Sequence, residues 1–420
     1  MKKFLTLVFL LFSLSITCAF AATTVEFTVD STEYSVLKTE AEKSSLEAAP
    51  YIKNSRTMAP VRAISEAFGA VVNWDDSTKT VFISNENTDV SIAIGSDKIK
   101  VNGEEKLIDS PAEIVNGTTF IPLRAITEVL GYYVYYVDAT RQILIDDIPP
   151  IFVVNGVGVP YNMFRAFYTY NTNLDEETGL PIRDEYLSLE VYDFLVPIFT
   201  MYSNAQGSIP TLSEEAKSEI STEAANLVSS NERGRFVLSG SLALYFEKYL
   251  TSQEFSNMIM ESYMASASDE AARKYYNANF VRAKHVLIST ATRTDEEALA
   301  IANTVYEKAS AGESFDNLIS QYGEDPGAAQ YPDGYVFTRG EMIKPFEDMA
   351  FSMNVRTISK PVKTDYGYHV IAKYDLFETP EILDALKSMV VEAEFDKYQE
   401  SLIENAEILT NITFSEVLYI

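Results

Sequence analysis

Two histidines are the side chains best suited to chemistry in this chain of 420 residues. They are the only histidines in the sequence. His285 lies in the apolar run RAKHVLIS, and His369 lies in GYHVIAKY. Both runs have the β-branched, apolar composition of buried strands. An antiparallel pairing of the runs would place both imidazoles in one interior. Because imidazole exchanges protons near neutral pH, the pair predicts a chemical centre.

Local signals predict the elements that position these strands. Thr294 and Glu297 form a capping box that opens a helix, and Gly312 ends it. A second helix follows Ser314, and a third covers residues 344–353. The resulting order β-α-α-β-α-β predicts an antiparallel sheet with helices packed on it.

The sequence of residues 282–375 resembles that of the parvulin-type peptidyl-prolyl isomerases. The resemblance is carried, in order, by AKHVLI, GESFDNLISQYGEDPGA, FTRGEM, FEDMAF and ISKPVKTDYGYHVI. It implies a catalytic group of polar residues and an apolar pocket for the proline ring. The polar residues would be His285, Asp325, Thr364 and His369, and the pocket residues Met342 and Phe346. No cofactor and no metal are implied.

Isomerisation of a prolyl bond needs no nucleophile, because it is rotation about a C–N bond with a barrier of roughly 18–20 kcal/mol. An apolar pocket that excludes water favours the twisted, less polar amide. In the resemblance, Thr364 links the histidines and Asp325 lies beside the reactive amide, with its protonation state open. The histidines either act directly or form a buried, supporting pair. The family's GGDLG segment is YPDGY here, and Gly334 predicts a more open pocket.

A gapless internal repeat precedes this region. The motif TMAPVRAISEAFGAVVNWDDSTKTVFIS at residues 57–84 recurs as TFIPLRAITEVLGYYVYYVDATRQILID at residues 119–146. Each copy predicts a helix that begins at a proline, carries an arginine and a glutamate four residues apart, and leads into a strand hairpin. The segment between them predicts a turn at residues 102–104.

The two copies resemble the copper amine oxidase N-terminal-like repeat domain of exported Gram-positive proteins. Despite that name, the region has no histidine or cysteine, so we expect no metal there. The resemblance implies a presentation or attachment module. The pairs Arg62–Glu66 and Arg124–Glu128 either hold the fold or take part in binding.

Composition limits the classes of function. A formal net charge of −28 disfavours binding to nucleic acid or anionic lipid. Residues 1–21 have the charged start, apolar run and small-residue end of an export signal. The only cysteine, Cys18, lies inside it, and lipidation there is an alternative to cleavage. No later segment approaches the roughly 20 apolar residues of a membrane span.

These observations predict a multidomain α+β protein. The expected parts are a signal peptide (1–21), an α+β repeat domain (22–148), an α-helical chaperone-like domain (149–281), a parvulin domain (282–375), and a C-terminal helix that packs on the chaperone-like domain (376–420). The chaperone-like assignment follows a loose resemblance of VNGVGVPYNMF to the foldases of the PrsA and SurA type.

The predicted function is an exported foldase, secreted or at the cell surface of a Gram-positive type of bacterium. Its partners would be unfolded secreted proteins with X-Pro bonds, with cell-wall material as a second partner of the repeats. Two alternatives stay open: a non-catalytic extracytoplasmic chaperone, and a surface-attachment protein.

Overall fold

The chain forms two compact units in the computed structural model. The described residues are 22–38, 40–173, 176–177, 182, 185–207, 212–229, 237–375 and 380–412. The larger unit takes Met1–Met258 and Gln399–Ile420, and the smaller unit takes Ile259–Tyr398. The smaller unit is therefore an insertion in the larger one. The predicted export signal, with Cys18, lies outside the described residues.

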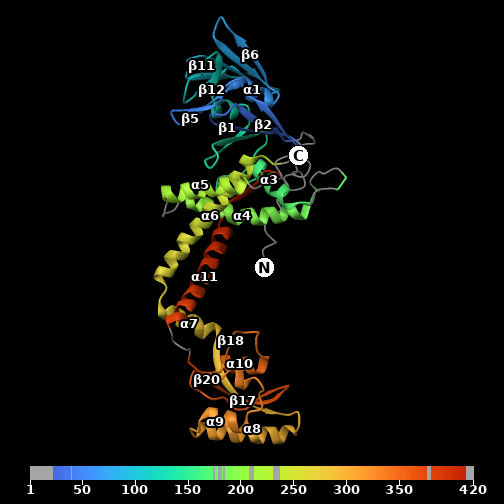
Figure 1. The fold of residues 1–420 in the computed structure, drawn as a ribbon, viewed down its shortest axis with the longest axis vertical. Helices are drawn as coiled ribbons and strands as arrows, with labels where there is room; N and C mark the ends of the chain where they lie inside the picture. Colours follow the sequence, from blue (N-terminus) through green and yellow to red (C-terminus); the bar gives the residue numbers. More distant parts are fainter. Residues whose placement is uncertain are drawn as a thin grey trace. The chain divides into compact units, whose positions relative to one another are not determined.

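The larger unit begins with a strand-rich domain, drawn in blue to teal in Figure 1, that contains two copies of the same series of elements. The first copy runs β1 (Thr24–Thr28), β2 (Glu33–Leu37), β3 (Ala41–Ser45), β4 (Tyr51–Lys53), β5 (Arg56–Pro60), α1 (Val61–Ala67), β6 (Val71–Asp75) and β7 (Thr80–Ser84). The second runs β8 (Asp89–Ala93), β9 (Lys98–Val101), β10 (Glu104–Leu107), β11 (Glu113–Val115), β12 (Thr118–Pro122), α2 (Leu123–Thr127), β13 (Tyr133–Val137) and β14 (Gln142–Asp146). The structural repeat is thus longer than the motif that the sequence reveals.

The two copies exchange strands. One five-stranded sheet has the order β13-β14-β1-β2-β3, and the other has the order β10-β9-β8-β7-β6. A four-stranded sheet, β11-β12-β5-β4, lies at the centre of the repeat pair, and in it Ala59 pairs with Ile121. These are equivalent positions of the two copies, so a pseudo-twofold axis passes between them. The β9–β10 register, with Val101 opposite Glu104, confirms the predicted turn.

A helical segment follows the repeats. Its elements are β15 (Phe152–Val154), β16 (Val157–Val159), α3 (Tyr161–Asn171), α4 (Glu185–Gly207), α5 (Glu214–Ser229) and α6 (Ser239–Ser266). Helix α6 continues without a break through Thr251 and Ser252. The hydroxyl of Ser252 donates to the carbonyl of Tyr249, which keeps a residue that often ends helices inside this one.

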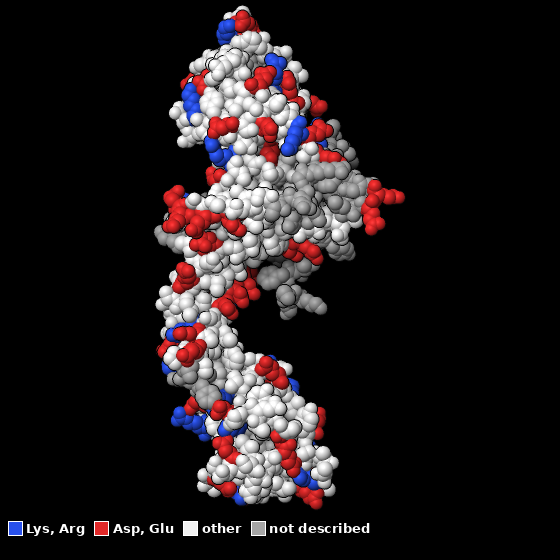
Figure 2. Space-filling model, viewed as in Figure 1, with Lys and Arg blue, Asp and Glu red and all other residues white. Residues whose placement is uncertain are grey.

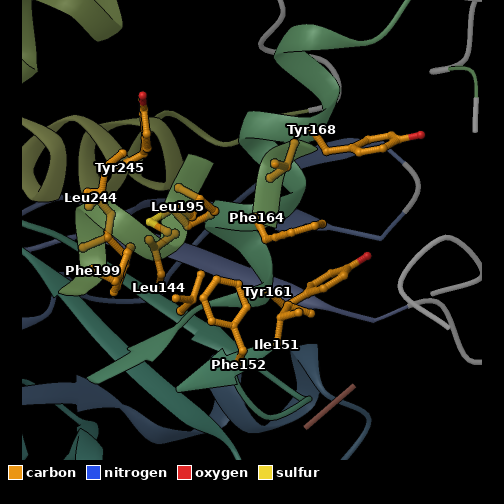
Figure 3. Packing of buried hydrophobic residues seen from close by; sticks show 14 of the residues in the cluster. Leu144, Ile151, Phe152, Tyr161, Phe164, Tyr168, Leu195, Phe199, Leu244 and Tyr245 are labelled. Carbon is orange, nitrogen blue, oxygen red and sulfur yellow. The ribbon is translucent and has the colours of Figure 1, made fainter. Parts of the chain in front are cut away.

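Aromatic and aliphatic side chains fill the core of this segment (Figure 3). Phe152, Phe164 and Phe199 are at most 1% exposed, and Leu144 of β14 lies in the same cluster. One core therefore joins the repeats to the helices. Strand β21 (Ile408–Thr410) pairs with β15, so the end of the chain returns to this core. Tyr245 on α6 is 7% exposed and packs in the same core.

Two buried carboxylates of the repeats cap helices of the helical segment. Glu26 on β1 accepts hydrogen bonds from the backbone N–H of Gly240 at 2.7 Å and from the hydroxyl of Ser239 at 3.1 Å, at the start of α6. Asp146 on β14 accepts from the side-chain amide of Asn162 at 2.7 Å, at the start of α3. Burial raises the pKa of both carboxyl groups, that of Asp146 to about 6. Negative charge at a helix N-terminus is stabilising, which offsets part of the desolvation.

Acidic side chains cover the exposed face of α5, where Figure 2 shows a red patch. They are Glu214, Glu215, Glu219 and Glu223, all exposed. This face is solvated and carries part of the strong negative charge of the chain. Within the described residues, no helix is both long and apolar enough to cross a membrane.

The smaller unit contains a four-stranded antiparallel sheet with the order β18-β17-β20-β19. Its elements are the end of α6, α7 (Asp269–Asn279), β17 (Val281–Ser289), α8 (Asp295–Ser310), α9 (Phe315–Tyr322), the 3₁₀ turn η1 (Ala328–Gln330), β18 (Tyr335–Phe337), α10 (Lys344–Ser352), β19 (Val362–Thr364), β20 (Gly367–Tyr374) and α11 (Pro380–Glu404). The capping box of Thr294 and Glu297 is confirmed. The sequence analysis missed β19, which has only three residues.

We predict that Gly240→Ala destabilises the larger unit by about 1–3 kcal/mol, the usual range for an overpacked site. A Cβ atom there would lie 2.8 Å from the Glu26 carboxylate and 3.3 Å from Cβ of Gln142. The sign of the change in the free energy of unfolding is informative. Replacing glycine by alanine inside a helix normally stabilises a protein by about 0.5–1 kcal/mol. Urea unfolding followed by the fluorescence of Trp74 measures the change. Gln253→Ala, at an exposed site of the same helix, is the control and should leave the midpoint nearly unchanged.

Candidate active site

The register of β17 and β20 brings the two histidines together. His285 lies opposite Ile371, and Leu287 lies opposite His369, so the histidines occupy diagonal positions on the same face of the sheet. Val286 and Val370 point to the other face, where α8 and α9 cover them. The predicted antiparallel pairing and shared interior are confirmed.

Five side chains form a continuous hydrogen-bonded series, which we call the polar chain. Its members are Tyr335, Asp325, His285, His369 and Thr364. The Tyr335 hydroxyl donates to Asp325 Oδ2 at 2.6 Å, and the same oxygen lies 2.9 Å from His285 Nε2. The two Nδ1 atoms are 3.0 Å apart, and His369 Nε2 lies 2.8 Å from the Thr364 hydroxyl. The structure therefore brings all four predicted polar residues together.

One direction of donation satisfies every link with both rings neutral. An ionised Asp325 only accepts, so His285 carries its hydrogen on Nε2 and its Nδ1 is an acceptor. His369 must then donate from Nδ1 and accept at Nε2 from the hydroxyl of Thr364. That hydroxyl oxygen accepts in turn from the backbone N–H of Tyr366 at 3.2 Å. All four ring nitrogens are engaged within the polar chain, which leaves none pointing at a substrate.

The electrostatics of the polar chain agree with this assignment. Desolvation, followed by the neighbouring His285, lowers the pKa of His369 to about 4, so this ring is neutral at physiological pH. Burial alone would raise the pKa of Asp325, but hydrogen bonds from His285, Tyr335 and the Gly327 N–H outweigh it and lower that pKa. Asp325 is therefore ionised. The lowered pKa favours the ionised form of a carboxyl group whose protonation state the sequence left open.

Exposure falls along the polar chain. His285 and Asp325 are partly exposed, whereas His369 and Thr364 are buried. Only the His285–Asp325 end of the polar chain approaches solvent. A substrate reaching the polar chain would therefore meet this end first.

The two predicted pocket residues lie on the same side of the sheet. The ring of Phe346 meets both imidazoles edge-on, at centroid distances of 5.2 Å to His285 and 5.4 Å to His369. Phe346 is 3% exposed, and the partly buried Met342 belongs to the same apolar cluster. Phe346 thus forms the apolar floor beside the histidines, and Met342 lies nearer the surface.

Tyr335 is a member of the polar chain that the sequence analysis missed. Its ring lies 5.6 Å from that of His285, in an edge-on arrangement. The preceding Gly334 has φ +94°, and a Cβ atom there would lie 2.9 Å from the carbonyl oxygen of Ala283. Gly334 thus permits the close approach that brings Tyr335 over Asp325. The clue in the sequence was YPDGY, which we interpreted only as a lost apolar position.

A buried glutamate supports the loop that carries Met342. Glu347 on α10 is 6% exposed, and its carboxylate accepts a hydrogen bond from the backbone N–H of Gly340 at 2.6 Å. The sequence analysis did not single out Glu347, because a glutamate in the first turn of a helix usually serves only the helix dipole.

Comparison with known families agrees with this geometry. Residues 270–375 match the model of the PPIC-type PPIASE domain. The chain carries a PPIC-type parvulin domain. Residues 36–145 match the copper amine oxidase N-terminal domain. Both predicted family resemblances are confirmed, as is the predicted mixed architecture of a β-rich repeat domain, a helical region and a parvulin domain.

Curated relatives match part of this chain and part of their own length. The foldase protein PrsA of Geobacillus sp. is 37% identical over 32% of this chain and 46% of its own. PrsA of Halalkalibacterium halodurans is 28% identical over 49% of this chain and 63% of its own. The chaperone SurA of Chromohalobacter salexigens is 33% identical over 28% of this chain and 27% of its own. This chain thus spans about half the length of the PrsA relatives that it matches.

Solved structures also match. The parvulin of Nitrosopumilus maritimus is 37% identical over 23% of this chain and 96% of its own, with a TM-score of 0.19. The PrsA isomerase of Bacillus cereus is 20% identical over 60% of this chain and 98% of its own, with a TM-score of 0.31. Within the part of the chain that the structure describes, no group of three His, Cys, Asp or Glu side chains is placed to hold a metal ion.

We predict one histidine of each neutral tautomer at pH 7, with the ring hydrogen on Nε2 in His285 and on Nδ1 in His369. Because the chain has only two histidines, ¹⁵N-histidine NMR resolves both rings. His369 should gain charge only near pH 4. Since an unfolded histidine takes its proton near pH 6.5, the parvulin domain should lose stability as pH falls from about 6.5 to 4.

Two matching tautomers at pH 7, or titration of His369 near pH 6.5, would contradict this assignment. His369→Gln is the control for stability, because glutamine keeps a donor and an acceptor but does not titrate. Hydrogen exchange in β17 and β20 of this variant should vary less with pH over the same window than in the wild type, after correction for the intrinsic rate.

Proposed function

We propose that this protein is an exported foldase that catalyses cis–trans isomerisation of peptidyl-prolyl bonds in unfolded secreted proteins. The observation that carries the proposal is the polar chain with Phe346 packed against both of its imidazoles. The family match over residues 270–375 supports the reaction type.

The proposed mechanism places a proline ring on the apolar side of the polar chain. Rotation about the prolyl bond removes amide resonance, so the twisted amide is less polar than the planar one. An apolar wall of Met342 and Phe346 favours the less polar state by excluding water. This effect needs no proton transfer, which fits two histidines whose four nitrogens are already hydrogen-bonded.

In this proposal, the polar chain holds the apolar wall in position and determines how polar the site beside that wall is. The Asp325 carboxylate accepts from Tyr335, His285 and the Gly327 N–H, so its oxygens are directed into the protein. Repulsion between this carboxylate and a substrate carbonyl is thereby reduced. We assign Asp325, His369 and Thr364 as positioning residues and the His285 edge as the polar border of the site.

We further propose that the helical segment binds unfolded clients. Phe194 on α4 is 42% exposed and stacks on Phe167, with centroids 4.9 Å apart and ring planes inclined by 5°. Leu189 on the same helix is 44% exposed. Exposed apolar side chains of this kind suit transient contact with unfolded chains. Binding of clients without catalysis is the alternative function that this observation favours.

Export and surface location complete the proposal. Residues 1–21 have the composition of an export signal, and cleavage after Ala21 or lipidation at Cys18 would release or anchor the protein. We propose that the N-terminal repeats hold the foldase to cell-wall material, where secreted chains emerge unfolded.

We predict that the wild type accelerates isomerisation of a proline peptide and that Phe346→Ala lowers kcat/KM at least about tenfold, or about 1.4 kcal/mol. The substitution removes the apolar wall beside the histidines. Phe315→Ala is the matched control, because Phe315 is also buried but lies in the core on the other face of the sheet.

Both substitutions remove a buried phenyl ring and should destabilise by about 3–5 kcal/mol. If activity per folded molecule stays at the wild-type value in Phe346→Ala, Phe346 acts only through stability. An equal fall in both variants would mean that the loss of any buried ring disturbs the site and that Phe346 has no specific role. If the folded wild type does not accelerate isomerisation, the proposed isomerase activity is wrong and the client-binding alternative remains.

Asp325→Asn should also lower kcat/KM about tenfold. An amide cannot accept from all three donors, so either one hydrogen bond is lost or the tautomers of both histidines reverse. The ¹⁵N-histidine spectrum distinguishes this from a purely structural effect. Asp333→Asn, which removes an exposed carboxylate from the neighbouring loop, should change neither the spectrum nor the rate. An unaltered spectrum in Asp325→Asn would contradict the positioning role.

A further inference from the structure

The repeat domain contains two pockets that are copies of each other. The first has a volume of about 390 Å³, and the second about 490 Å³. Both are open depressions at the surface and not enclosed cavities. The offset of 62 residues that relates the two sequence motifs also relates most of the two linings.

The matched positions come from the helix start, the strand hairpin and the central sheet. From the first pocket to the second, Pro122 corresponds to Pro60, Leu123 to Val61, Arg124 to Arg62, Val134 to Val72, Tyr136 to Trp74, Ile143 to Val81, Ile52 to Ile114 and Thr57 to Thr119. Each pocket takes its helix and hairpin from one copy and its isoleucine and threonine from the other. A single repeat would therefore not complete a pocket.

The exposed residues that line the two pockets are of the same chemical type at equivalent positions and are exposed to the same extent. Trp74 and Tyr136 are both 37% exposed, and Ile114 and Ile52 are 44% and 45% exposed. Exposed positions outside the linings differ between the copies, such as Val71 and its equivalent Tyr133. Burial in a core does not account for large apolar side chains kept at the surface, so a shared binding role is the better explanation.

Arg62 and Arg124 have N–H groups that are available to donate hydrogen bonds to a ligand. Arg62 lies 3.7 Å from Glu66, and Arg124 lies 3.8 Å from Glu128, with all four side chains at least half exposed. Exposed pairs at such distances stabilise a fold by less than about 1 kcal/mol. A guanidinium has five N–H donors, so most remain for a ligand. The fold-holding interpretation of these pairs is therefore weak.

The charges around each pocket nearly balance. The second pocket has Arg62 and Lys79 against Glu47 and Asp76. The first has Arg56 and Arg124 against Asp109. Figure 2 shows Lys and Arg interspersed with Asp and Glu over this domain. Such a site favours a ligand with little net charge and many hydroxyl or amide groups.

We propose that the two pockets bind a glycan chain at two points. A pyranose ring has an apolar C–H face that packs on an exposed aromatic ring, and its rim of hydroxyl and N-acetyl groups suits arginine donors and threonine hydroxyls. Two equivalent sites in one domain favour a repeating polymer, because the second contact forms at high effective concentration. The inference rests on the proposed attachment role and is independent of the isomerase site.

Calorimetric titration of the full chain with an N-acetylglucosamine trimer tests this inference. We expect two equivalent sites in the wild type and one in either Trp74→Ala or Tyr136→Ala. In the double variant, the affinity should fall at least tenfold. Tyr133→Ala is the matched control, because Tyr133 is 38% exposed on the same strand as Tyr136 but lines neither pocket. It should keep two sites and, like the pocket variants, normal isomerase activity.

Absence of trimer binding by the wild type, or two sites in the double variant, would overturn the inference. If the variants instead weaken binding of an unfolded proline-containing peptide, the pockets hold clients and the glycan assignment is wrong. A pull-down with purified cell wall tests attachment of the protein separately from glycan binding in the two pockets. Equal retention of wild type and double variant would leave attachment in place and exclude these pockets as its site.

Discussion

The contact between two Nδ1 atoms, 3.0 Å apart, is the constraint on which the parvulin site depends. It holds only if one nitrogen carries a hydrogen and the other does not, so two neutral rings must adopt opposite tautomers. The ionised Asp325 sets which ring donates, because a carboxylate can only accept, and the Thr364 hydroxyl at the other end can follow because it both donates and accepts. The contact also requires one register of β17 and β20, because a slip by one residue would turn one histidine to the opposite face. Fold and protonation state are thus set together.

Three carboxylates in this chain illustrate how burial and donors compete. Glu26 and Asp146 are almost fully buried, and their pKa values rise although each accepts several hydrogen bonds. Asp325 is less buried and accepts from a histidine, a phenol and a backbone N–H, and its pKa falls. The first two lie where the repeats meet the helices, and the third orients an imidazole. The same side-chain chemistry therefore serves assembly in one unit and the candidate site in the other.

The sequence predicted best what local pattern determines. The capping box at Thr294 and the two histidine strands depend on neighbouring residues, and both are found as expected. Tyr335 joins the polar chain through a loop with no periodic signal, so it was missed. The strand exchange between the repeats was missed for a related reason. Pairing of β1 with β14 depends on residues more than a hundred positions apart, and a repeat motif alone does not say which copy supplies the partner strand.

The long-range pairing has a consequence for the order in which the chain folds. Strand β1 must wait for β14, and β15 must wait for β21, which is among the last described residues. Every strand pairing of the parvulin sheet lies between Val281 and Tyr374. Since nearby pairings close faster than distant ones, a chain that emerges from its N-terminus can complete this sheet while the larger unit still lacks its final strand. The domain proposed to assist other chains can thus be complete before the unit into which it is inserted.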